Sequence, residues 1–164
     1  MENKKYYTSG EVHAMDAGTW TLGKDDLRKK TNVALSKIPI DIVDDLYDNC
    51  YFLIESEVGK ASYFPVGFFN NKAIIIISDA YLKSADDKAL EHTIMHEVAH
   101  HALKHKNPSQ HGLSNEEYDK QEKEAHEQVE KWLNEYEKAD PITKLDGNEW
   151  AKEFMKQSGG ESYT

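Results

Sequence analysis

The sequence is poor in cysteine and in long apolar runs. Cys50 is the single cysteine among 164 residues, which excludes an internal disulfide and suits a reducing compartment. No apolar run approaches the roughly 20 residues that a membrane-spanning helix needs, and the first residues lack the apolar segment of a signal peptide. We therefore expect a cytoplasmic protein without a membrane segment, in which Cys50 is a buried, inert thiol.

Positive charge is scarce as well. The chain has 20 Lys and Arg against 30 Asp and Glu, a formal net charge of -10. This balance disfavours nucleic acid and anionic membranes as partners. The length fits one domain with a real hydrophobic core. We expect that domain to comprise an N-terminal helical extension (residues 1–37), a core (38–138), and a C-terminal helix and tail (139–164).

The most informative stretch is His-Glu-Val-Ala-His at residues 96–100. Two histidines four residues apart on a helix project from the same face, so both imidazoles can reach one tetrahedral Zn²⁺ at about 2.0–2.1 Å. Glu97 lies beside these ligands, where it can accept a proton from a metal-bound water. This is the metallopeptidase motif H-E-x-x-H. A chain with eight histidines and many glutamates can also contain the motif by chance.

The motif lies within a pattern typical of a helix. Ser84 is a candidate N-cap, and Asn107-Pro108 is expected to end the helix. A broad apolar side faces away from the two histidines and predicts that the helix packs on a core; it comprises Leu90, Ile94, Met95, Val98, Ala99, Ala102 and Leu103.

The residues before the motif predict a small sheet. We expect strands at 50–54, 61–69 and 72–78, the last two joined by a tight turn at Asn70-Asn71. Residues 74–77 are four consecutive isoleucines, which predicts a central strand or one covered on both faces. After the motif, Ser114 opens a capping box for a second long helix, and a last helix is expected over 145–155. The predicted class is α+β, with a small antiparallel sheet of about three strands packed on the motif helix and the second long helix.

A catalytic zinc site needs a third protein ligand. The residue six positions after His100 is Lys106, which excludes the metzincin pattern. His101 and His105 point to another side of the helix. His92 lies one turn before His96, but histidines on three consecutive turns of a straight helix cannot all converge on one ion. We expect these three to be solvated or hydrogen-bonded.

The second long helix offers a better candidate. Glu122 falls within its apolar stripe, which contains Tyr118, Ala125, Val129, Trp132 and Tyr136. A carboxylate there is costly unless it is paired or binds a metal, so Glu122 is the favoured third ligand; the alternative is a marginal position from which it reaches solvent. Glu124 and Glu127 point away from the stripe.

Two further residues on this helix are left open as candidates. His126 follows Glu122 by one turn and could hydrogen-bond a ligand, act as an electrophile, or be exposed. Tyr118, like Tyr63, could donate to a tetrahedral oxyanion.

Taken in order, residues 38–41, 68–76, 93–100 and 122–125 resemble the ImmA/IrrE-type zinc metallopeptidases. The resemblance covers roughly residues 38–133. It implies a zincin-like, gluzincin-like fold in which the first glutamate of an E-x-x-A motif is the third zinc ligand, and this glutamate corresponds to Glu122. It also implies a protein or peptide substrate, often a repressor or regulator, in a bacterial, phage or mobile-element system.

We therefore expect a zinc-dependent metallopeptidase. His96, His100 and Glu122 would hold Zn²⁺, and Glu97 would act as the general base for a zinc-activated water. The main alternative is a non-catalytic, zinc-stabilised protein-interaction domain on the same scaffold. A hydrolase acting on a substrate other than a peptide, with the same site, is a third alternative.

Overall fold

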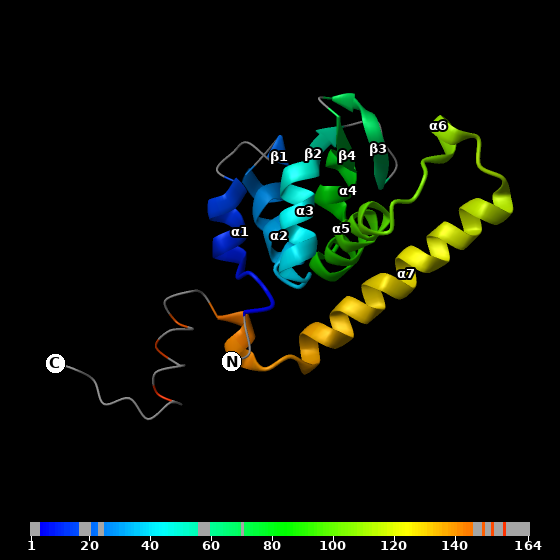
Figure 1. The fold of residues 1–164 in the computed structure, drawn as a ribbon. Coiled ribbons are helices and arrows are strands. Elements are labelled where there is room, and N and C mark those ends of the chain that lie inside the picture. Colours follow the sequence, from blue (N-terminus) through cyan, green and yellow to red (C-terminus); the bar gives the residue numbers. More distant parts are fainter. Residues whose placement is uncertain are drawn as a thin grey trace.

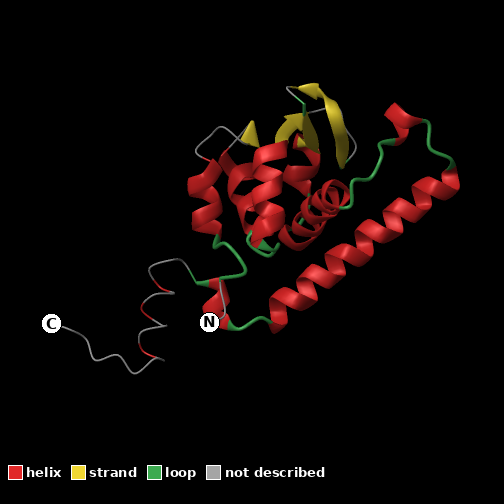
Figure 2. Ribbon diagram, in the orientation of Figure 1, coloured by secondary structure: helices red, strands yellow, loops and turns green. Residues whose placement is uncertain are grey.

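A computed structural model describes residues 4–16, 21–22, 25–55, 60–69 and 71–145, together with positions 149, 152 and 156. The described elements follow one another as α1 (Ser9–Asp16), β1 (Thr21–Leu22), α2 (Asp25–Leu35), α3 (Ile40–Asn49), β2 (Cys50–Glu55), β3 (Ala61–Phe69), β4 (Lys72–Ser78), α4 (Asp79–Ser84), α5 (Asp87–Ala102), α6 (Pro108–His111), α7 (Asn115–Lys138) and a 3-10 turn (Pro141–Lys144). The class is α+β and mostly helical, with the strands gathered at one end and the helices below them (Figures 1 and 2).

The sheet is mixed, so the prediction of an antiparallel sheet is wrong. Its strand order is β1-β2-β4-β3, in which β1–β2 and β2–β4 are parallel and β3–β4 is antiparallel. The chain reverses twice between β2 and β4, so the two strands run in the same direction. β4 then inserts between β2 and β3. The three longer strands agree with the predicted number, and β1 adds a two-residue edge.

β4 is central, as its isoleucine run predicted. Ala73, Ile75 and Ile77 are fully buried, whereas Ile74 and Ile76 are only partly buried, so one face of the strand is the more deeply covered. Asn71 adopts a positive φ of 60° in the turn before β4, a conformation that asparagine tolerates. The other predicted turn residue, Asn70, lies outside the described residues.

The hydrophobic core joins the N-terminal helices to the rest of the domain. Val12 of α1 and Leu35 of α2 are fully buried in the same cluster as Ile75 of β4 and Ile94 of α5. Cys50 is buried there too, and burial raises the pKa of its thiol to about 12, consistent with an inert side chain. The predicted C-terminal helix over 145–155 falls almost entirely outside the described residues. Among the described helices, none combines the length and apolar character needed to cross a membrane.

Helix α7 lies along the outside of the molecule and packs against α5 (Figure 1). Its N-terminus is the predicted capping box: the Ser114 hydroxyl accepts from the Glu117 backbone N–H, and the Glu117 carboxylate accepts from the Ser114 N–H. Ala125, Val129 and Trp132 are the buried residues of α7. This stripe holds the helix on the core and fixes which residues face α5.

The ends of α5 differ from the prediction. Its N-cap is Asp86, whose carboxylate accepts from the Ala89 N–H at 2.9 Å, whereas Ser84 is the last residue of the preceding helix α4. Its C-terminus is Ala102, five residues before the predicted stop, because Lys104 takes a positive φ of 57° and turns the chain back. Ser84 was a plausible cap in sequence, but the short helix α4 uses it as its own C-terminal residue.

The two candidate caps make different predictions for stability. Replacing Asp86 by Ala should lower the free energy of unfolding by about 1 kcal/mol, because the Ala89 N–H loses its partner. Replacing Ser84 by Ala should change it by no more than about 0.5 kcal/mol, because the Ser84 hydroxyl only donates to carbonyls of its own helix. Urea unfolding of both variants measures the difference, and equal losses would contradict this assignment.

Candidate metal centre

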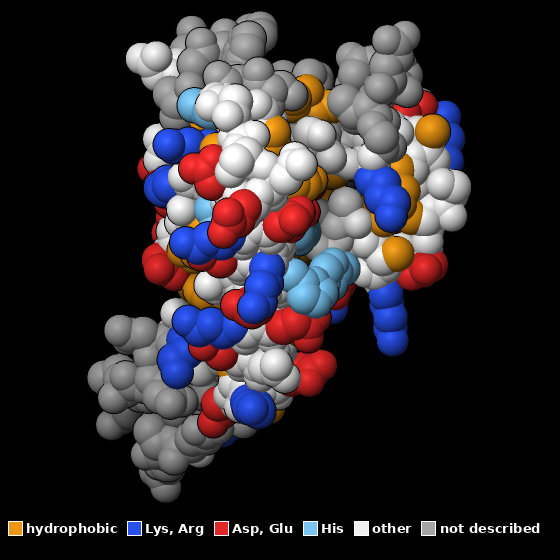
Figure 3. Space-filling view, turned by 90° about the vertical axis from the view of Figure 1, so that its right-hand side faces the viewer, with side chains coloured by type: hydrophobic (Ala, Val, Ile, Leu, Met, Phe, Trp, Pro, Cys, Tyr) orange, Lys and Arg blue, Asp and Glu red, His pale blue; other side chains and the backbone are white. Residues whose placement is uncertain are grey.

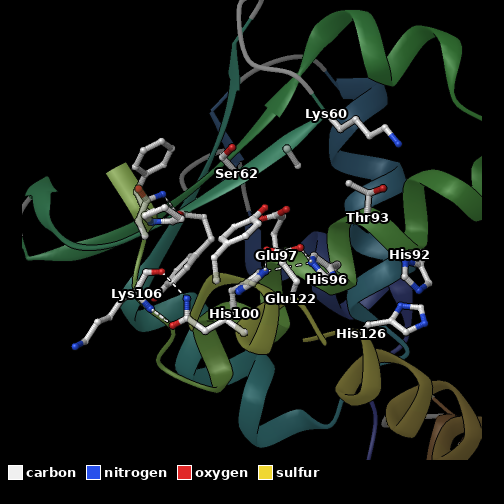
Figure 4. Close-up of a pocket in the computed structure, with 17 residues that line it drawn as sticks. Lys60, Ser62, His92, Thr93, His96, Glu97, His100, Lys106, Glu122 and His126 are labelled. Atoms are coloured by element: carbon white, nitrogen blue, oxygen red, sulfur yellow. Dashed lines mark hydrogen bonds and ion pairs between the residues drawn. The ribbon is translucent and has the colours of Figure 1, made fainter. Parts of the chain in front are cut away.

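Three side chains from two helices converge on one point. The Nε2 atoms of His96 and His100 lie 3.2 Å apart. Oε2 of Glu122 lies 3.2 Å from Nε2 of His96, and Oε1 of Glu122 lies 3.4 Å from Nε2 of His100. Figure 4 shows the three side chains pointing toward one another among the residues that line a cavity. The structure thus brings Glu122, chosen in sequence from its place in the apolar stripe, to the histidine pair.

These distances fit a tetrahedral metal ion. Four ligands at about 2.05 Å from a zinc ion are separated from one another by about 3.3–3.4 Å. The three separations, 3.2, 3.2 and 3.4 Å, are close to that spacing. Two imidazoles and one carboxylate are the donor set of a catalytic zinc site that leaves a fourth position for water. The separations and the donor set of His96, His100 and Glu122 therefore fit a zinc ion.

Helix geometry explains why the three residues meet. His96 and His100 occupy successive turns of one face of α5, while the opposite side of the helix contributes Ile94 and Val98 to the core. α7 crosses this face with Ala125 buried, one turn beyond Glu122. The apolar contact between the two helices thus aims the Glu122 carboxylate at the imidazoles.

The charges at this point are strongly coupled. Hydrogen bonds from His100 and His96 hold the pKa of Glu122 far below its usual range, against a smaller opposing effect of burial. Burial lowers the pKa of His96, but the hydrogen bond to Glu122 and the charges of Glu97 and Glu122 outweigh it and raise the pKa overall. Glu122 is therefore ionised, which is the form that binds a metal.

Glu97 lies beside the ligands, almost enclosed. Its side chain is 8% exposed, and it lines the same cavity as His96, His100 and Glu122. Burial raises the pKa of its carboxyl group, and the charge of Glu122 adds to this effect. His100, His96 and a hydrogen bond from the Tyr63 backbone act in the opposite direction without reversing the shift. A carboxyl group with a raised pKa holds a proton more readily than an exposed one, which suits a group that must accept a proton.

A series of hydrogen bonds that the sequence does not predict supports the imidazole of His100. Its Nδ1 lies 2.9 Å from Nδ1 of His105, and Nε2 of His105 lies 3.2 Å from Oε2 of Glu124. One assignment of protons leaves Nε2 of His100 free to bind a metal: Nδ1–H of His100 donates to His105, and Nε2–H of His105 donates to Glu124. The Glu124 carboxylate therefore orients the imidazole of His100 through His105.

The end of α5 places His105 in this position. The His105 N–H donates to the His100 carbonyl at 3.0 Å, and the Lys104 N–H donates to the His101 carbonyl at 3.1 Å. This pair of hydrogen bonds around a left-handed residue is a Schellman motif. Glycine usually occupies the left-handed position of this motif, but here the residue is Lys104. The sequence therefore predicts a longer helix, on which His105 would not meet His100.

A second buried histidine has a structural role. Nε2 of His101 lies 2.9 Å from Oδ2 of Asp45 on α3, and its Nδ1 lies 3.4 Å from the Tyr63 hydroxyl. His101 and His105 are thus hydrogen-bonded, one of the two outcomes expected for them. Tyr63 turns its hydroxyl toward His101 and stacks its ring parallel to that of His100, with ring centroids 6.4 Å apart.

Of the two candidate tyrosines, Tyr118 has the better-placed hydroxyl. Tyr118 lines the cavity, and its pKa is raised by burial and by the charge and hydrogen bond of the neighbouring Glu122. His126 also lines the cavity, but its ring lies beside that of His92, with centroids 5.2 Å apart. His126 therefore faces a neighbouring cluster and not the three convergent ligand atoms.

The cavity has a volume of about 550 Å³. Its walls come from the start of β3, from α5 and from α7, with residues 60–64 opposite the ligands. Figure 3 shows pale blue histidine side chains near the middle of this face, flanked by acidic and basic side chains. The cavity is open to solvent, and the start of β3 forms part of its wall.

Removing Glu122 should abolish tight metal binding. We expect wild-type protein, loaded with Zn²⁺ and dialysed against metal-free buffer, to retain about one zinc per chain, and Glu122→Ala to retain almost none, because two imidazoles alone hold zinc weakly. Glu127→Ala is the matched control, since Glu127 lies on α7 near Lys123 and away from the site. Elemental analysis decides, and equal zinc in both variants would refute Glu122 as a ligand.

The hydrogen bonds that link His100 to His105 and Glu124 should strengthen zinc binding without changing the number of ions bound. We expect His105→Ala and Glu124→Gln to weaken zinc binding by about 10–100-fold, because the imidazole of His100 loses the partner that orients it. Competition with a chromophoric chelator measures this change, with Glu127→Gln as the control. Wild-type affinity in both variants would show that the hydrogen bonds at 2.9 and 3.2 Å do not act on the site.

Comparison with known proteins identifies no relative: no family model, no curated protein and no solved structure matches this chain. Function is therefore argued from the geometry of the site.

Proposed function

We propose that this chain is a zinc-dependent metallopeptidase. The observation that carries the proposal is the combination of three convergent ligand atoms with a buried carboxylate beside them in one open cavity. His96, His100 and Glu122 alone account for holding a metal ion but not for proton transfer. Glu97 is not needed to hold a metal, and burying a carboxyl group without a function is costly. A general base next to the ligands is what hydrolysis requires.

His96, His100 and Glu122 would hold the metal, and Glu97 would move the proton. A zinc ion in such a site supplies Lewis acidity, lowering the pKa of water toward about 7 and polarising a carbonyl group. Glu97 accepts the proton of the attacking water and delivers it to the amine nitrogen that leaves.

Tyr118 is the proposed donor to the negatively charged oxygen that develops during hydrolysis. Its side chain lines the cavity from α7, next to Glu122, and its raised pKa keeps the hydroxyl protonated and able to donate. Tyr63 would support the site in another way: its backbone donates to Glu97, and its hydroxyl is directed to His101.

An extended peptide is the substrate that the cavity fits best. Among the described strands, β3 lies at the edge of the sheet and pairs only with β4, and its residues 61–64 line the cavity. A peptide can add to such an edge through backbone hydrogen bonds and so run past the convergent ligands. A segment of a repressor or regulator is the substrate suggested by the ImmA/IrrE resemblance. Kinship with that family is part of the same proposal, supported by the order of hairpin, H-E-x-x-H helix and Glu122 helix.

The decisive variant is Glu97→Gln. It keeps the size of the side chain and all three ligands, so zinc content should stay at the wild-type level. Hydrolysis should fall by about 10²–10⁴-fold, because glutamine cannot accept the proton. A fluorogenic peptide library with the zinc-loaded protein measures the loss, and Glu127→Gln serves as the control.

Two results would contradict the peptidase. Equal cleavage by wild type and Glu97→Gln would trace the activity to a contaminant. Zinc-loaded wild-type protein that cleaves no member of the library, yet binds one zinc per chain, would favour the non-catalytic interaction domain.

A further inference from the structure

A second group of metal-binding side chains lies along the same helix pair. Ligand atoms of His92, His126 and Glu130 all lie within 4.8 Å of one another. Nε2 of His92 is 3.8 Å from Oε1 of Glu130, and the rings of His92 and His126 have centroids 5.2 Å apart at an angle of 45°. Figure 4 shows the imidazoles of His92 and His126 side by side. Like the first group, this one offers two imidazoles and one carboxylate.

The second group repeats the first with the helices exchanged. In the first, α5 provides two ligands, His96 and His100, and α7 provides one. In the second, α5 provides only His92, one turn before His96, and α7 provides two residues four apart, beyond Glu122. Two ligands four apart on one helix and one from the facing helix can hold a metal in either arrangement. The second group therefore follows from the same antiparallel packing and needs no other element.

The second group is more open than the first. The His92 side chain is 36% exposed and that of Glu130 is 54% exposed. The 3.8 Å between Nε2 of His92 and Oε1 of Glu130 exceeds the tetrahedral spacing of about 3.4 Å. These side chains must therefore move closer together to bind an ion. Exposed side chains can make that movement, but they lose conformational freedom by doing so. The second group should therefore bind a metal more weakly than the first.

The two groups share one cavity. His92 and His126 line it together with His96, His100 and Glu122, and the ring centroids of His92 and His96 are 6.4 Å apart. An ion held by the second group would lie in the cavity wall, next to the first site but bound by different residues. Two imidazoles in the donor set favour a transition metal such as Zn²⁺ over Mg²⁺ or Ca²⁺, which prefer oxygen ligands.

We propose that His92, His126 and Glu130 form a second, exchangeable binding site for a zinc-like divalent ion. The test is equilibrium dialysis of the folded chain against a series of free Zn²⁺ concentrations, with bound metal determined by elemental analysis. Wild-type protein should bind two ions in two separate steps. The more weakly bound ion, which binds in the second step, should be the first to leave on dilution. A single step with one ion per chain, up to the highest concentration that leaves the protein in solution, would overturn the proposal.

Variants assign the second step to its ligands. His126→Ala and Glu130→Ala should each weaken it by about tenfold or more, since even residues behind a metal ligand contribute about 10–100-fold. His111→Ala and Glu127→Ala are the matched controls, a histidine and a glutamate outside the group, and should keep both steps. Circular dichroism verifies that every variant is folded. If the second step survives His126→Ala and Glu130→Ala combined, the ion binds elsewhere and the proposal fails.

The same experiment separates this proposal from the peptidase. Glu122→Ala should lose the tight step and retain the weaker one, because Glu122 belongs only to the first group. The readout is bound metal and does not depend on any substrate. Loss of both steps in Glu122→Ala would show that the second group has no affinity of its own and would overturn the proposal.

Discussion

The antiparallel packing of α5 on α7 is the constraint on which the site depends. Each helix alone presents a row of polar side chains that could face solvent. Ala125 and Val129 of α7 are fully buried where this helix packs against α5, and this burial brings the rows together. Because a helix rises about 5.4 Å per turn, sliding one helix by a single turn would move Glu122 away from His100. The register of an apolar contact therefore decides whether the carboxylate meets the imidazoles.

The cavity contains two carboxyl groups whose pKa values shift in opposite directions. Glu97 and Glu122 are carboxylates at the same place, which alone would favour protonation of one of them. The imidazoles of His96 and His100 affect the two carboxyl groups differently. Direct hydrogen bonds keep Glu122 ionised, whereas buried Glu97 retains a raised pKa. The two neighbouring carboxyl groups thus acquire different properties from their surroundings, one suited to bind a cation and the other to exchange a proton.

Much of this arrangement could be predicted from the sequence. The isoleucine run of β4 identified the central strand, Ser114 identified the start of α7, and the apolar stripe of α7 singled out Glu122. These signals are local periodicities or caps, which a single sequence contains. The direction of β2 relative to β4 could not be predicted, because hydrophobic alternation does not depend on strand direction.

The support behind His100 could not be predicted either. Lys104 adopts a left-handed conformation at the end of α5 although its sequence position lacks the usual glycine. Everything that follows from this turn, including the contacts of His105 with His100 and Glu124, was therefore invisible in the sequence. The partnership of His92 with His126 and Glu130 was missed for a related reason, because it exists only across the two helices and not along either one.

The position of α7 on the outside of the molecule has a consequence for the abundance of the protein. An ion shared by α5 and α7 would bind the folded chain and not the unfolded one, so it would add about 4 kcal/mol of stability at a thousandfold excess over its dissociation constant. That is a large part of the roughly 5–15 kcal/mol that keep a typical domain folded. Chains that fail to acquire the ion would open more often and be degraded sooner by cellular proteases. The supply of metal would then set how many copies of the protein persist.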